Sequence, residues 1–420
     1  MADRSTLQSR GPLYALLAAN VVSQTGNSLS YLAIPWFVLT TTGSATSTGI
    51  AVAVGALPVI IVGIFGGAIV DRLGYKPTSV VSDIASCVAV LLIPILHQTV
   101  GIAFWQLLVL VFLGALLDMP GSAARGSLFP ELVAGTGLTL ERANAAYSVT
   151  GRLASTLSAP VGGILIAALG ATTLLYLNAV SFAISAAIVA LRVPSRRVPG
   201  TTSDAARRID RYLADVREGF AFLYRDRLLL WMVLSFSIGG LVAEPLYAVI
   251  LPVYAHERYG SAINLGFIFT GLAVGSIVGN VIFAGLNQRL PRSGVIIGGF
   301  ALRAAAFWAL VFVPPWGVIA GAIFIGAVLF EPINPLFMTI FQKRVPSGMR
   351  GRVLGAVAAL GAGTFPLGIA TYGYLLDRID LDATLLLFVI VNTTLPVAMY
   401  LTPVLRNIRV PVAADQVSSP

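Results

Sequence analysis

Charged side chains interrupt several of the long apolar stretches of this sequence. They are Asp83, Asp118, Arg152, Glu244, Arg303 and Glu331. A charge inside a bilayer is costly, so each one marks a candidate functional position. Burial of a carboxyl favours its protonated form, which lets it exchange a proton near neutral pH. We therefore take Glu244, Glu331 and Asp118 as candidate proton-coupling groups. The two arginines are candidate intramembrane charge partners for them.

The composition indicates a membrane protein. Of the 420 residues, 57% are hydrophobic and 11% are charged, and the mean hydropathy is +0.88. A soluble globular protein has roughly 25% charged residues, which this chain lacks. Backbone groups in hydrocarbon must be bonded internally, and the apolar runs are continuous and not alternating, so the spans should be helices. We expect an all-α membrane protein.

Twelve spans are predicted from apolar runs of about 20 residues. They cover residues 13–40, 47–70, 78–96, 103–124, 145–169, 172–191, 228–254, 262–286, 294–313, 316–340, 353–376 and 382–404. Two six-helix bundles follow from this, at 1–191 and 228–405, with a linker at 192–227 and a cytoplasmic tail at 406–420.

The linker contains a predicted amphipathic helix. Its apolar stripe is Ile209, Leu213, Val216, Phe220 and Leu223, with charges on the other face. We expect this helix to lie on the inner membrane surface near anionic lipid, or to act only as a tether.

Basic residues predict the orientation, because cytoplasmic loops are enriched in them. The loops and termini assigned to the cytoplasm hold Arg72, Lys76, Arg125, Arg142, Arg289, Arg292, Lys343, Arg344, Arg350, Arg352, Arg406 and Arg409. Only Arg258 and Arg378 fall in loops assigned to the external side of the membrane. The net charge of +9 is thus a topology signal, and no nucleic-acid partner is expected. We expect a multi-pass protein of the cell inner membrane with both termini cytoplasmic.

Metal and disulfide chemistry are not indicated. Cys87 is the single cysteine, and His97 and His256 are the two histidines. One cysteine cannot form an internal disulfide or a cysteine-based metal cluster. We expect no metal site and no cofactor.

An internal repeat relates the two halves. The pattern Pro-x7-Gly-Ser-Ala-x3-Gly occurs at 35–49 and again at 252–266, an offset of 217 residues. Pro160-x-Gly162 recurs as Pro366-x-Gly368 at an offset of 206. Six helices are therefore repeated in parallel orientation, and the first offset makes Asn27 and Glu244 equivalent.

A charged turn separates the second and third spans: Gly67-Ala68-Ile69-Val70-Asp71-Arg72-Leu73-Gly74-Tyr75-Lys76. It resembles the loop between helices 2 and 3 of the major facilitator superfamily of secondary transporters. The run APVGG at 159–163 is similar to the proline–glycine signature of antiporter-type members. ERANA at 141–145 and RGRV at 350–353 are similar to the macrolide-efflux and enterobactin-exporter branch. The fourth span, ending at 124, lacks the arginine that many drug–proton antiporters carry there.

The resemblance implies a conformational latch in this turn. Asp71 would meet the N-terminal end of the eleventh helix, whose dipole favours an anion, and hold the outward-open state. The proposed latch consists of Gly67, Asp71, Arg72, Gly74 and Lys76, with the glycines allowing the tight backbone. The alternative is a plain hairpin whose charges only set topology.

The resemblance also places the first and seventh helices along a central cavity. Tyr31 lies four residues after Asn27, and Tyr247 lies three after Glu244, so each helix presents an aromatic ring on the same face. We expect these four residues to line a substrate cavity for a bulky lipophilic solute. Alternatively, Glu244 only ties helices together.

Prolines mark two further positions. Pro160, Gly162 and Gly163 predict a bend of the fifth helix with close packing. Glu331 precedes Pro332, which opens the helix hydrogen bonding, and it resembles the coupling acids of some multidrug antiporters.

Asp118 lies in the fourth span, near the position that the repeat makes equivalent to Glu331. It couples protons, or it pairs with Arg152 or Arg125 and so pins the fourth and fifth helices together.

By resemblance, the chain is expected to be a secondary transporter whose two bundles rock about a midplane site. We expect a monomer that exports lipophilic drugs, cationic and macrolide-type compounds among them, in exchange for protons. The partners are then a small-molecule substrate, protons and membrane lipids. A siderophore or lipid exporter is the alternative within this fold, and a non-transporting receptor is the alternative of another class. An ATP-driven pump is not expected, because the sequence lacks the phosphate-loop pattern. An enzyme is not expected, because H-E-x-x-H and G-x-S-x-G are absent from the sequence.

Overall fold

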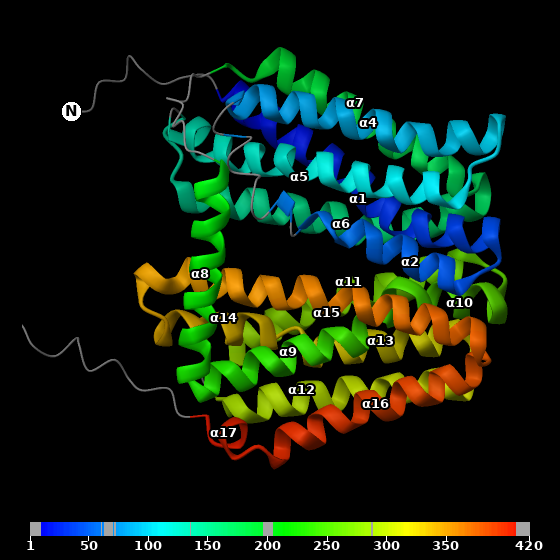
Figure 1. Cartoon of the computed structure of the whole chain (residues 1–420), viewed down its shortest axis with the longest axis vertical. Helices are drawn as coiled ribbons and strands as arrows, with labels where there is room; N and C mark the ends of the chain where they lie inside the picture. Colours follow the sequence, from blue (N-terminus) through cyan, green and yellow to red (C-terminus); the bar gives the residue numbers. More distant parts are fainter. Residues whose placement is uncertain are drawn as a thin grey trace, which may run out of the picture. The chain divides into compact units, whose positions relative to one another are not determined.

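The computed structural model describes residues 10–59, 61–62, 70, 73–134, 136–195, 205–286 and 289–408. All regular structure in these residues is helical (Figure 1). Within them, nine helices are long and apolar enough to cross a membrane, and the shorter apolar helices Ala45–Ala56 and Thr156–Leu169 accompany them. The predicted all-α membrane fold is confirmed.

The chain divides into two compact units. The first contains Met1–Ile209 and Gly260–Gly266. Its helices are α1 (Gly11–Thr42), α2 (Ala45–Ala56), α4 (Tyr75–Thr99), α5 (Phe104–Ala134), α6 (Leu140–Leu169) and α7 (Ala171–Arg192). Helix α1 packs against α6 and α7, and α4 packs against α5 and α7.

The second unit contains Asp210–Tyr259 and Phe267–Pro420. Helix α8 (Ala205–Arg225) leads into it. The elements that follow are α9 (Arg227–Pro245), η2 (Leu246–Ile250), α10 (Leu251–Tyr254), η3 (Ala255–Tyr259), α11 (Ala262–Leu286), α12 (Arg292–Phe307), η4 (Trp308–Phe312), α13 (Trp316–Phe330), α14 (Ile333–Arg344), η5 (Ser347–Met349), α15 (Arg350–Arg378), α16 (Leu381–Leu401) and α17 (Pro403–Arg406). Within this unit α9 packs against α15 and α16, and α12 packs against α13 and α16.

Helix α5 corrects one predicted boundary. It continues to Ala134 and does not end at residue 124. Arg125, expected in a cytoplasmic loop, lies inside this helix and is 1% exposed. The predicted boundary lies just before Arg125 because a cation is expected to lie in water, but this cation is paired with Asp83 inside the unit. The expectation that the fourth span lacks an arginine is therefore wrong.

The seventh span is not a plain α-helix. After Pro245 it passes through the π-helical turn η2, the short helix α10 and a second π-helical turn, η3. The amide of Leu251 donates to the carbonyl of Leu246, five residues earlier. Such turns are rare and frequently occur at functional sites, and the first of them begins two residues after Glu244.

Prolines act differently in α6 and in the tenth span. Helix α6 continues without interruption through Pro160. In contrast, α13 ends at Phe330 and α14 begins at Ile333, so the hydrogen bonding opens at Pro332 as predicted.

The linker helix α8 docks on α15. Arg352 forms ion pairs with Asp215 at 2.9 Å and with Glu218 at 2.7 Å. A Cβ atom on Gly219 would collide with the carbonyl oxygen of Arg352, so the two backbones are in close contact.

The apolar stripe of this helix divides along its length. Leu223 is buried and Phe220 packs against the same core of the second unit, whereas Leu213 is exposed. The predicted membrane-facing stripe is therefore wrong for its C-terminal residues, which serve the core of the second unit.

Two glycines at equivalent repeat positions should respond differently to alanine. A Cβ on Gly368 would overlap the carbonyl oxygen of Leu241, which belongs to rigid backbone. A Cβ on Gly162 would meet only leucine methyl groups, the nearest being Leu29 Cδ2 at 3.2 Å. We expect Gly368→Ala to lower the free energy of unfolding by roughly 1–3 kcal/mol, the usual cost of overpacking, and Gly162→Ala to cost less. Thermal unfolding of the purified protein in detergent measures both.

Gly363→Ala is the matched control for this comparison. It lies on the same helix, α15, and a Cβ there would have nothing within 4 Å. Equal midpoints for Gly368→Ala and Gly363→Ala would contradict the close contact of α9 and α15.

Candidate functional site

A buried ion pair joins α4 and α5 in the first unit. Arg125 Nη1 lies 2.7 Å from Asp83 Oδ1, and neither side chain is more than 1% exposed. Ser185 Oγ on α7 donates to Asp83 Oδ2 at 2.7 Å, and Arg125 Nη2 donates to Ser23 Oγ on α1 at 3.3 Å. Both carboxylate oxygens of Asp83 are thus bound, as a buried charge requires.

Asp118 lies beside this pair but is less completely bound. Its Oδ2 accepts a hydrogen bond from Asn27 Nδ2 at 2.9 Å. Its Oδ1 lies 3.8 Å from Arg125 Nη2 and receives no hydrogen bond from any described group. Since a carboxyl oxygen can accept a proton, Asp118 is the carboxyl of this cluster that is open to protonation.

This geometry changes the predicted pairing of Asp118. Asp118 and Arg125 are seven residues apart on the same helix, α5, which is the fourth predicted span. Their contact therefore cannot pin this span to the fifth one, α6. The partners that Arg125 does bind lie on α1 and α4. Arg152 belongs to α6, but its side chain is outside the described residues.

Arg303 is the corresponding buried cation of the second unit. It lies on α12, is 8% exposed, and has its guanidinium carbon 3.6 Å from the ring centroid of Phe330. The rings of Phe300 and Phe307 are 5.2 and 5.7 Å away. No carboxylate among the described residues lies within ion-pair distance of it. Aromatic faces therefore hold this charge by cation–π attraction.

Glu244 and Glu331 lie in the same unit at irregular points of their helices. Glu244 is partly buried at the end of α9, and Glu331 is partly buried in the break between α13 and α14. Both are close enough to Arg303 to act on its charge. Tyr247, in η2, has its ring 6.3 Å from that of Phe269.

The four residues predicted for a substrate cavity fall into two groups. Asn27 and Tyr31 lie on α1, where Asn27 binds Asp118 and Tyr31 is half exposed. Glu244 and Tyr247 lie in the second unit. The structure therefore adds Asp118 as a direct neighbour of Asn27, which the repeat alone did not indicate.

Among the side chains that the structure describes, each unit has one buried guanidinium with two carboxyls near it. In the first unit these are Asp83, Asp118 and Arg125, and in the second Glu244, Glu331 and Arg303. With every group ionised, each of these sets carries one net negative charge; Arg152 of α6 is not counted, because its side chain lies outside the described residues. Uncompensated charge is unfavourable in hydrocarbon, so each set can accept one proton or attract a cationic ligand.

The latch residues are only partly visible. Gly67, Asp71 and Arg72 lie outside the described residues. Gly74 has φ of 85°, a conformation that favours glycine, and precedes α4, whose first turn contains Lys76. In α6, a Cβ on Gly163 would lie 2.7 Å from the carbonyl oxygen of Ala262, within the same unit, so the predicted close packing at this glycine is present.

Removing one ring from Arg303 tests the cation–π arrangement. We expect Phe330→Leu to lower the free energy of unfolding by about 1–2 kcal/mol, since a desolvated cation loses its nearest aromatic face. Phe312→Leu is the control, because Phe312 is largely exposed. Thermal unfolding in detergent measures both, and equal effects would contradict a role for the Phe330 ring.

Comparison with known proteins identifies the family of this chain. The sequence profile described as Major Facilitator Superfamily matches residues 16–363, and a second match covers 243–418. The multidrug efflux pump Tap of Mycolicibacterium fortuitum is 29% identical, over 96% of this chain and 98% of that protein. Its namesake from Mycobacterium tuberculosis is 30% identical over 97% of both chains. Macrolide efflux protein A of Streptococcus pyogenes is 22% identical over 89% of this chain and 91% of that protein.

Solved structures show the same fold. The crystal structure of the nucleoside transporter NupG gives a TM-score of 0.74 at 12% identity, covering 91% of this chain and 98% of that one. A POT family transporter in complex with 5-aminolevulinic acid also gives 0.74, at 11% identity, covering 94% and 96%. Together with the profile match over most of its length, these findings show that the chain belongs to the Major Facilitator Superfamily, a family of membrane transporters.

Proposed function

We propose that this protein exports lipophilic drugs, cationic and macrolide-type compounds among them, in exchange for protons by alternating access. The observation that carries the proposal is Asp118, a carboxyl inside a membrane-spanning helix with one oxygen open to a proton. Relatives that match nearly the whole chain are called multidrug efflux pumps, and a more distant one is called a macrolide efflux protein.

Proton exchange at Asp118 would act through its neighbours. The deprotonated carboxylate attracts Arg125, which Asp83 already holds, and accepts the hydrogen bond from Asn27. Protonation removes that attraction and lets Asp118 donate a hydrogen bond. The bonding of α1 to α5 would therefore depend on the proton, and this is the contact through which a proton can favour one conformation over another.

The second unit supplies the other proposed groups. Glu244 and Glu331 are further candidate coupling carboxyls, with Arg303 as their charge partner. Asn27 and Tyr31 of the first unit, and Glu244 and Tyr247 of the second, are proposed to contact substrate. A lipophilic cation would be attracted to the net negative charge of either set.

We also propose the setting of this activity. The basic residues favour cytoplasmic termini, and we place the protein in the cell (inner) membrane. The protein would work as a monomer in contact with membrane lipids, with Asp71 acting as the latch.

Drug accumulation in cells tests the proposal. Cells that express the protein should accumulate less ethidium and less erythromycin than cells that do not. An uncoupler that collapses the proton gradient should abolish the difference. Equal accumulation of both compounds in the two strains would contradict drug export, and a difference that survives the uncoupler would contradict proton exchange.

A further inference from the structure

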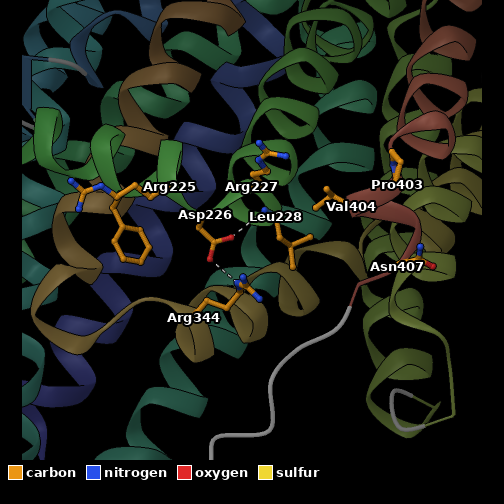
Figure 2. A pocket seen from close by; sticks show the side chains of 9 residues that line it. Arg225, Asp226, Arg227, Leu228, Arg344, Pro403, Val404 and Asn407 are labelled. Carbon is orange, nitrogen blue, oxygen red and sulfur yellow. Dashed lines mark hydrogen bonds and ion pairs between the residues drawn. The ribbon is translucent and has the colours of Figure 1, made fainter.

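Two adjoining cavities open in the second unit where α8 ends and α9 begins. The first has a volume of about 770 Å³, and its polar lining consists of Arg225, Asp226, Arg227, Arg344 and Asn407 (Figure 2). The second has about 740 Å³ and contains Tyr224, Trp231 and Leu401. The two share Arg227, Pro403 and Val404. A cationic compartment thus continues directly into an apolar one.

The charges of the first cavity are not balanced. Arg344 Nε lies 2.7 Å from Asp226 Oδ2, while Asp226 Oδ1 accepts hydrogen bonds from the amides of Leu228 and Leu229 at the start of α9. Both oxygens of Asp226, the one carboxylate among the lining residues, therefore already have partners. Arg225 and Arg227 lie on either side of it (Figure 2), are exposed, and form no ion pair with any described residue.

The second cavity lies at the ends of two helices that are long and apolar enough to cross a membrane, which puts it near the expected membrane–water boundary. The membrane-spanning part of α9 begins at Arg227, and that of α16 ends at Leu401. Trp231 and Tyr224, which are 42% and 80% exposed, lie in the lining of this cavity near these helix ends. Tryptophan and tyrosine favour the headgroup region of a bilayer. A soluble anion would use the arginines alone, whereas a lipid would use both compartments.

We propose that these cavities bind one acidic phospholipid. Its phosphate is bound by the guanidinium groups of Arg225 and Arg227, since guanidinium groups bind phosphate oxygens through paired hydrogen bonds. The first carbons of its acyl chains lie along Trp231 and Leu401. Basic pockets on the cytoplasmic side of membrane helices suit such headgroups. The site does not depend on the proposed transport of drugs.

Native mass spectrometry of the full-length protein tests this site with dioleoylphosphatidylglycerol and dioleoylphosphatidylcholine as probes. Phosphatidylglycerol should bind more tightly than phosphatidylcholine. The double variant Arg225→Gln/Arg227→Gln should bind phosphatidylglycerol about 25-fold more weakly, since each arginine near an anionic lipid contributes roughly fivefold. Arg217→Gln, an exposed arginine of α8 outside both cavities, should bind like the unmodified protein.

Further variants keep the result independent of folding. Arg225→Lys/Arg227→Lys retains both charges and should keep most of the affinity for phosphatidylglycerol. Equal binding of the two lipids would overturn the proposal, as would an equal loss in Arg217→Gln. Displacement of phosphatidylglycerol by millimolar inorganic phosphate would overturn it in favour of a soluble anion.

Discussion

Asp118→Asn should abolish transport driven by a proton gradient while leaving exchange of drug for drug intact. An amide has nearly the same shape as the carboxyl and can still accept the hydrogen bond from Asn27. It cannot bind or release a proton, so the cycle loses its coupling step. In proteoliposomes, drug accumulation after a pH jump should fall to the level of empty vesicles. Counterflow of labelled against unlabelled drug should persist.

Glu257→Gln is the control for this experiment. Glu257 is an exposed acid in η3, and neutralising it should leave both assays unchanged. Full activity of Asp118→Asn in the gradient assay would move the coupling role to the second unit. In that case Glu244→Gln and Glu331→Gln, tested separately, should show the loss.

Asp83→Asn is expected to cause the largest loss of stability in the first unit. It leaves Arg125 buried with a neutral partner, and breaking a buried pair from one side costs about 3–5 kcal/mol. Asp118 lies 3.8 Å from Arg125 and offsets part of this, so the lower end of the range is expected. The midpoint of thermal unfolding in detergent should fall accordingly, and less folded protein should be recovered from membranes.

The double variant Asp83→Leu/Arg125→Met separates charge from packing. Replacing a buried pair by apolar groups of similar size is often neutral or stabilising, so it should recover most of the loss. Asp382→Asn breaks the exposed pair with Arg258 and should cost under about 1 kcal/mol. A double variant as unstable as Asp83→Asn would show that charge is not what matters at this position.

Hydropathy predicts the membrane helices well, because each is a long apolar run, and it fails where a charge is neutralised internally. The predicted fourth span stops just before Arg125, although α5 continues to Ala134. Its partner Asp83 lies 42 residues earlier in the chain, on α4. No helical spacing connects them, so the pair could not be predicted from sequence.

The surroundings of Arg303 were predictable in part. Phe300 and Phe307 lie three residues before and four residues after it on α12, positions that share a helix face. The closest ring, Phe330, comes from α13 and has no such signal. Likewise, the link between Asn27 and Asp118 joins α1 to α5, and only the folded unit brings them together.

The π-helical turn at Leu246–Ile250 has a consequence for length variation. Elsewhere in a span, deleting one residue rotates everything after it by about 100° and turns buried side chains outward. A π turn holds one residue more than the α turn it replaces, so a deletion there restores α geometry and keeps the following residues in phase. Homologous sequences can therefore carry a one-residue gap at 246–250 without displacing buried Tyr254.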